Sequence, residues 1–105
     1  MTDAPACQWV SASALRKMFN DGDYWQRAKD GEFTEHILRD GHPTSPSAPE
    51  PHCTRSQYIA YIDQFGNTIA EVHQYVRPDG TLGASGRPSP HALMVDNIIY
   101  VRDDY

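Results

Sequence analysis

Two runs between Gln57 and Leu82 are rich in aromatic and β-branched residues in a period-two pattern with mixed faces, and a turn-forming tetrapeptide separates the two runs. Alternation with a period of two, in runs rich in aromatic and β-branched residues, is typical of half-buried β-strands. The tetrapeptide at 64–67, QFGN, contains Gly and Asn, which tolerate the positive φ angles of tight hairpin turns. The stretch therefore predicts an antiparallel hairpin with strands at 58–63 and 68–76, around which the rest of the chain must pack.

Two short helices are predicted before this hairpin. Ser11 or Ser13 is a suitable N-cap for the first helix, because the apolar residues that follow recur at spacings of three and four and form one helical face. Asp23 can cap a second helix over residues 24–29, and an Asp-Gly pair ends it.

Further strands are predicted on both sides of the hairpin. Residues 32–39 alternate again, and residues 94–101 flank the dipeptide Asp96-Asn97, which suits a two-residue hairpin turn. Residues 41–55 contain four prolines and predict an extended loop, because proline cannot join a ladder of strand hydrogen bonds. We therefore expect a single α+β domain over residues 1–105, with a flexible N-terminus at 1–8 and short N-terminal helices packed on a small antiparallel sheet of four to five strands.

The charge balance narrows the class of partner. Fourteen Asp and Glu against nine Lys and Arg give a formal net charge of -5, whereas affinity for nucleic acid comes mainly from Lys and Arg. We therefore expect no direct nucleic-acid binding. No apolar run is long enough to span a membrane and no signal segment is apparent, so we expect a soluble cytoplasmic protein whose Cys7 and Cys53 are free thiols.

His73 is the first candidate for a catalytic residue. Glu71 shares its strand face, because residues two apart on a strand point the same way, and Arg77 follows shortly after. A histidine, a carboxylate and a guanidinium can serve as general base, general acid and anion stabiliser in phosphodiester cleavage. Helices that precede a small antiparallel sheet resemble the general layout of small bacterial ribonuclease toxins, although the acidic net charge disfavours RNA as a ligand.

A second candidate site is an anion-binding loop between Arg77 and Arg87. Gly83 and Gly86 allow close approach of the backbone to a ligand, and successive N–H groups can form an anion nest. The histidines and cysteines show none of the short spacings of metal ligands, so we expect no metal and no cofactor.

The function that the composition favours is protein binding without catalysis. Aromatic side chains on strand faces and an acidic surface suit a basic protein partner, as in phage anti-defence or immunity proteins that inhibit nucleic-acid-handling machinery. A small ribonuclease-like hydrolase that uses His73, Glu71 and Arg77 is the alternative, and a structural subunit that self-associates is a third class. The partner-binding patch is expected at the acidic residues of the helical region, which are Asp21, Asp23, Asp30, Glu32 and Glu35.

Overall fold

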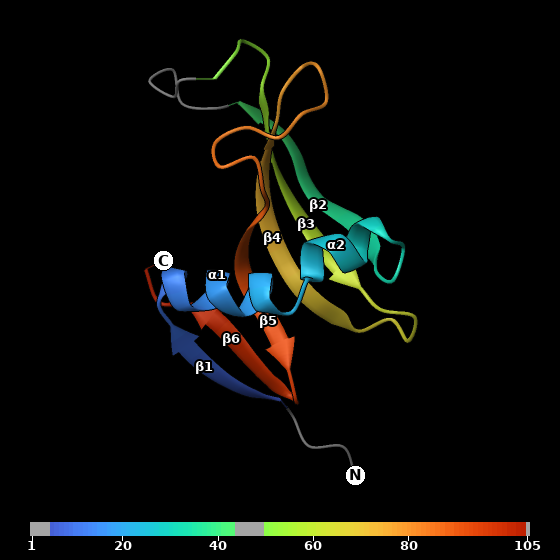
Figure 1. The fold of residues 1–105 in the computed structure, drawn as a ribbon, viewed down its shortest axis with the longest axis vertical. Coiled ribbons are helices and arrows are strands. Elements are labelled where there is room, and N and C mark those ends of the chain that lie inside the picture. The colour runs from blue at the N-terminus through green and yellow to red at the C-terminus, as the bar shows by residue number, and fades with distance from the viewer. Residues whose placement is uncertain (1–4, 44–49, 105) are drawn as a thin grey trace.

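The computed structural model describes residues 5–43 and 50–104, which form one mixed sheet with two helices on one of its faces (Figure 1). The strand order is β1-β6-β5-β4-β3-β2. Strands β2 to β6 form an antiparallel meander, and β1 pairs in parallel with β6. In chain order the elements are β1 (Ala6–Val10), α1 (Ala12–Asp21), α2 (Tyr24–Lys29), β2 (Thr34–Pro43), β3 (Arg55–Ile62), β4 (Thr68–Val76), β5 (Ser89–Val95) and β6 (Ile98–Arg102).

The α+β class is confirmed, but the predicted number of strands and the purely antiparallel sheet are wrong. The sheet has six strands and is mixed. The difference arises at β1, which pairs Ala6 with Ile98 and so joins the two ends of the chain. Four of its five residues are exposed, so it lacks the alternation that identifies a strand from its sequence. Residues 6–8, expected in the flexible N-terminus, lie in this strand.

The two helices occupy the predicted positions. Ser11 caps α1, since its Oγ accepts a hydrogen bond of 3.1 Å from the backbone N–H of Ala14. Asp23 precedes α2 with a left-handed φ of 54° and makes no side-chain capping bond. Helix α1 crosses β5 and β6 (Figure 1) and closes a core whose largest members are the fully buried Phe19 and Tyr61.

The predicted turns are confirmed. Asp96 and Asn97 join β5 to β6 with φ angles of 50° and 64°, which are the positive values that a two-residue hairpin turn requires. Between β3 and β4, the side chain of Asp63 accepts hydrogen bonds of 2.9 Å from the backbone N–H groups of Phe65 and Asn67. The expected proline-rich loop is shorter than 41–55, because β2 runs to Pro43 and β3 begins at Arg55; residues 44–49 lie outside the described residues.

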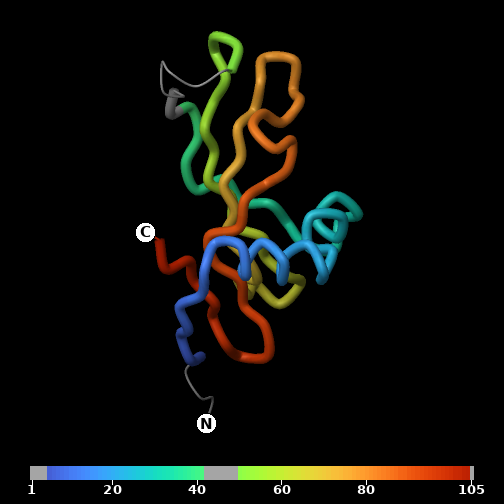
Figure 2. Tube along the Cα trace, turned by 60° about the vertical axis from the view of Figure 1, so that its left-hand side comes forward, coloured from blue at the N-terminus to red at the C-terminus, as the bar shows by residue number. Residues whose placement is uncertain are grey.

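The alternation along β4 separates two environments. Ala70 and Val72 are buried against the helices, whereas Glu71, His73 and Tyr75 project from the opposite face. We call this second surface, on the side of the sheet away from α1 and α2, the open face. The tube view in Figure 2 shows both helices on one side of the sheet.

Candidate functional site: a histidine and tyrosine cluster on the open face

Three neighbouring strands bring two histidines against one tyrosine. Tyr58 of β3 and His73 of β4 are cross-strand partners whose ring centroids lie 5.0 Å apart. His91 of β5 meets the Tyr58 ring edge-on at 5.1 Å and lies 5.9 Å from the His73 ring. We call these three side chains, together with Ser56 and Arg102 that bond to them, the His-Tyr cluster.

A β-bulge places His91 in this cluster. Ala92 pairs with Glu71 and Pro90 pairs with Val72, so His91 is an extra residue of β5 with no counterpart on β4. Bulges re-aim side chains and are frequent beside active sites. Pro90 suits this position, because prolines inside sheets occur mainly at edges and bulges.

The hydrogen bonds of His91 define its tautomer. Arg102 Nη1 lies 3.4 Å from His91 Nε2, and Tyr58 OH lies 3.5 Å from His91 Nδ1. Arginine only donates, so Nε2 accepts, and the proton of the neutral ring is on Nδ1, from which it is donated to the Tyr58 oxygen. Burial, and then the positive charge of Arg102, lowers the pKa of His91 to about 4. The ring is therefore neutral at pH 7, and the Tyr58 hydroxyl proton can be donated to a ligand.

His73 is held by a short bond to the neighbouring strand. Its Nε2 lies 2.6 Å from the Oγ of Ser56, whose exposed fraction is 9%. Burial, followed by the charge of Arg102, lowers the pKa of His73 below its usual value of 6.5. Both imidazoles of the cluster are therefore neutral at pH 7.

Two guanidinium groups border the cluster. Arg102 donates to both carboxylate oxygens of Asp104, at 2.9 and 2.7 Å. On the other side, Arg39 of β2 is the cross-strand partner of Tyr58 and lies with its Cζ 5.9 Å from that ring centroid. Arg39 is exposed, and it forms no ion pair with any residue in the described ranges. An anion that reached Tyr58 would meet the positive charge of Arg39, beside the carboxylate of Glu71 in the same depression.

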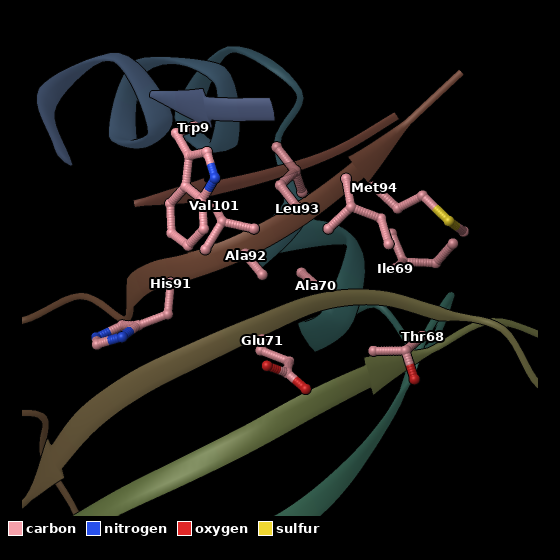
Figure 3. A pocket seen from close by; sticks show the side chains of 11 residues that line it. Trp9, Thr68, Ile69, Ala70, Glu71, His91, Ala92, Leu93, Met94 and Val101 are labelled. Carbon is pink, nitrogen blue, oxygen red and sulfur yellow. The ribbon is translucent and has the colours of Figure 1, made fainter. Parts of the chain in front are cut away.

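An apolar pocket of about 520 Å³ lies next to the cluster on the same face (Figure 3). It runs over β4, β5 and β6, and His91 lines its edge. Trp9 of β1 forms part of the wall with an exposed fraction of 62%. Glu71 is the one charged side chain among the described residues that line it. Glu71 also lines a smaller depression with Arg39 and Tyr58.

The structure brings together only part of the predicted catalytic set. Glu71 and His73 share the open face as expected, but Arg77 lies elsewhere and donates from Nε to Glu50 Oε2 at 2.8 Å. The guanidinium groups at the cluster come from Arg39, which lies over Tyr58, and from Arg102, whose charge acts on His73. Sequence reasoning missed these two residues, as well as Ser56, Tyr58 and His91, because strand register and a bulge bring them together and no motif marks them.

The loop predicted to bind an anion contacts a carboxylate of the chain itself. Glu50 accepts a bond of 2.7 Å from the Ala84 backbone N–H, and Arg77 and this N–H hold the pKa of its carboxyl below the usual range. A Cβ atom on Gly83 would lie 2.8 Å from the Glu50 carboxylate, which accounts for glycine there. Gly86 has a φ of 77°. The guanidinium group of Arg87 lies over the Trp25 ring, with its Cζ 5.3 Å from the ring centroid, and does not take part in the bonds to Glu50.

The five acidic residues predicted as a binding patch are spread from the last residue of α1, across the two ends of α2, to β2. Asp21 forms an ion pair of 2.6 Å with Lys17, and Glu32 accepts from Arg27 Nε at 2.7 Å. Asp30 accepts from the amide of Gln26 at 2.9 Å. Asp23 and Glu35 are exposed. The ion pairs neutralise part of the charge of this region, and its role in partner binding stays a prediction.

The remaining expectations concern the cysteines, a metal site and a membrane-spanning segment. Both cysteines are exposed free thiols. Within residues 5–43 and 50–104, no group of three or more His, Cys, Asp or Glu is placed to hold a metal ion. None of the described helices has the length and apolar character needed to cross a membrane. Comparisons with protein-family models, with curated proteins and with solved structures find no match to this chain.

Proposed function

We propose that this protein is a ribonuclease whose own side chains supply the acid and the base, and that the His-Tyr cluster is its active site. The observation that carries the proposal is the convergence of two neutral imidazoles and a phenol, bordered by two guanidinium groups. This set contains a proton acceptor, a proton donor and cations for a phosphate, which are the groups that acid–base cleavage of RNA requires.

The reaction proposed is transesterification by the ribose 2′-hydroxyl. His73 takes the proton of that hydroxyl as its oxygen bonds to the adjacent phosphorus atom. The bond from phosphorus to the 5′-oxygen breaks, and Tyr58 gives its proton to this leaving oxygen. The products are a 2′,3′-cyclic phosphate and a 5′-hydroxyl end, and proton exchange with water restores Tyr58 and His73.

The remaining members of the cluster support the two proton transfers. Negative charge that develops on the Tyr58 oxygen is stabilised by the Nδ1–H of His91, which Arg102 in turn polarises from the other side of the ring. Arg39 is placed to neutralise the phosphate, because it borders Tyr58 and is exposed. Ser56 holds the His73 ring in one orientation.

The overall acidity of the chain is compatible with this proposal. Charge acts locally, and a cation at a site attracts a phosphate even where the net charge is negative. Arg39 and Arg102 border the site, whereas the acidic residues Asp21 and Glu32 belong to the helical region and are paired with basic side chains.

Acyl transfer by Ser56 is a second candidate, because a nucleophile and its base lie within hydrogen-bond distance in such enzymes. The 2.6 Å contact with His73 meets that requirement. The exposed fraction of Ser56, only 9%, disfavours attack on a substrate. Replacing Ser56 by alanine separates the two candidates, since it would abolish acyl transfer but spare the acid and base of RNA cleavage.

Protein binding through the acidic patch is the third candidate, and the net charge of -5 favours it. It predicts that reversing the charge at Asp23, Asp30 and Glu35 weakens capture of a protein partner from a lysate. Unchanged capture would remove the patch from consideration.

The experiment that tests the ribonuclease proposal compares variants on a mixed-sequence RNA in the presence of a metal chelator. We expect His73→Ala and Tyr58→Phe each to lower kcat/KM by about 100-fold or more, which is the usual contribution of general acid–base catalysis. His52→Ala is the matched control, because His52 is exposed and precedes β3 outside the cluster. Equal rates for all these variants would overturn the proposal.

A further inference from the structure

We propose that the apolar pocket beside the cluster binds a guanine base of the RNA substrate, stacked on Trp9 and hydrogen-bonded by Glu71. This inference rests on the proposed ribonuclease function and assigns the specificity of the same site.

The pocket and the cluster are continuous. His91 lines the pocket and is also bonded within the cluster, so the two sites share a side chain. Glu71 precedes His73 by two residues on β4 and projects from the same face, which separates their Cα atoms by roughly 7 Å along the strand. A nucleotide whose phosphate lies at the cluster therefore has its base within reach of the pocket.

The shape and polarity of the pocket suit a flat ring. Its wall and floor are mainly apolar, from Trp9, Ile69, Leu93, Met94 and Val101 (Figure 3). The Trp9 ring is 62% exposed even though it borders this hollow. Exposed aromatic rings beside a nucleic-acid site provide stacking platforms for bases. The volume of about 520 Å³ leaves room for the ribose as well as the base.

Glu71 selects among the bases. Its cross-strand neighbours Ala60 and Ala92 are small, so its side chain has space on the open face. A carboxylate accepts hydrogen bonds and donates none, and guanine presents N1–H and N2–H donors side by side on one edge. Adenine and cytosine offer an amino group beside an acceptor nitrogen, and uracil flanks its N3–H with two carbonyls. The carboxylate therefore favours guanine.

The first test measures binding without catalysis. The chain has two tryptophans, so quenching by guanosine 3′-monophosphate is compared in the full-length protein, in Trp9→Phe and in Trp25→Phe. We expect quenching in the wild type and in Trp25→Phe, and its loss in Trp9→Phe. The concentration for half-maximal quenching should be about tenfold lower for the guanosine nucleotide than for the uridine nucleotide, and Glu71→Gln should remove this difference.

The second test compares the rates at which the same proteins cleave GpU, ApU, CpU and UpU. We expect GpU to be cleaved about tenfold faster than UpU by the wild type, and the preference to disappear in Glu71→Gln. Equal quenching by guanosine and uridine nucleotides, or quenching that persists in Trp9→Phe, would overturn the guanine site whether or not RNA is cleaved. Guanosine-selective quenching without any cleavage would keep the site and overturn the ribonuclease proposal instead.

Discussion

The Nε2 atom of His73 lies 2.6 Å from the Oγ atom of Ser56, and this contact ties the central histidine of the open face to the next strand. The Tyr75 ring meets the same imidazole edge-on at 4.8 Å. With Tyr58 at 5.0 Å, the ring has three neighbours that hold its orientation before any substrate binds. Such preorganisation is what a general base requires.

Replacing Ser56 by alanine tests this orienting role. We expect kcat/KM for RNA to fall by about tenfold, equivalent to roughly 1.4 kcal/mol of transition-state stabilisation, because His73 remains but loses its fixed orientation. Steady-state kinetics on a defined oligoribonucleotide measure the change. Complete loss of activity in a folded Ser56→Ala protein would show that the hydroxyl itself reacts.

Protonation of the cluster should destabilise the fold in mildly acidic solution. The pKa of His91 is about 4 in the folded protein against 6.5 in an unfolded chain, so below pH 6.5 the unfolded state binds more protons. Stability is then lost as the pH falls from 6.5 to about 4, and the upper part of this window lies above the range in which ordinary carboxyl groups titrate. The pKa of His73 is also lowered in the folded protein, so its protonation destabilises the fold in the same way.

Thermal unfolding from pH 7 to pH 4.5 measures this effect. As the pH falls, the melting temperature of His91→Asn should decrease less than that of the wild type. The melting temperature of His52→Asn should decrease as much as that of the wild type. An identical fall in all three proteins would contradict the assignment of His91 as a buried neutral imidazole.

The catalytic pH profile should reflect the same lowered pKa values. A general base acts in its neutral form, so kcat/KM rises with pH until that base is deprotonated. Because burial and Arg102 lower the pKa of His73, the acidic limb of the profile is expected below pH 6.5. An acidic limb above pH 7 would mean that a different group, or a charged imidazole, controls the reaction.

Tyr61→Phe should stabilise the protein. Tyr61 is fully buried, its hydroxyl has no hydrogen-bond partner among the described residues, and burial raises the pKa of the phenol. An unsatisfied buried hydroxyl is unfavourable, so its removal should add about 1 kcal/mol to the free energy of unfolding. Chemical denaturation measures the gain, and Tyr100→Phe is a half-buried control. A loss of stability in Tyr61→Phe would indicate that this hydroxyl has a partner in solution.

Glu50→Gln should loosen the loop between β4 and β5. The carboxylate of Glu50 accepts from both Arg77 and the backbone N–H of Ala84, and it ties this loop to the segment before β3 at the same end of the sheet (Figure 2). We expect faster amide hydrogen exchange at Ala84 and a lower melting temperature. Glu32→Gln is the control, because its ion pair with Arg27 is exposed and distant in the fold. Unchanged exchange at Ala84 would show that the bond to Glu50 is not formed in solution.

Local sequence patterns predicted the elements that depend on local chemistry. The Asp96-Asn97 turn, the cap at Ser11 and the helix at 24–29 follow from the residues themselves. Strand β1 escaped prediction because its pairing with β6 connects positions that are far apart in the sequence.

The candidate site was only half predictable for the same reason. Glu71 and His73 share a face by strand periodicity alone, and that was visible in the sequence. The approach of His91 depends on the extra residue in β5, and that of Tyr58 depends on the register of β3 against β4. Neither the bulge nor the register leaves a local signal, so Arg77 was chosen as the nearest cation in sequence, although it pairs with Glu50 and the cations that contact the cluster are Arg39 and Arg102.

The most direct measurement of the central claim is cleavage of one oligoribonucleotide and of its analogue that has 2′-deoxyribose at every position, with product masses determined by mass spectrometry. The ribonuclease account predicts cleavage of the RNA to fragments with a 2′,3′-cyclic phosphate, no cleavage of the deoxy analogue, and no products with His73→Ala. Intact RNA at high concentrations of folded wild-type protein, or cleavage of both substrates alike, would contradict it.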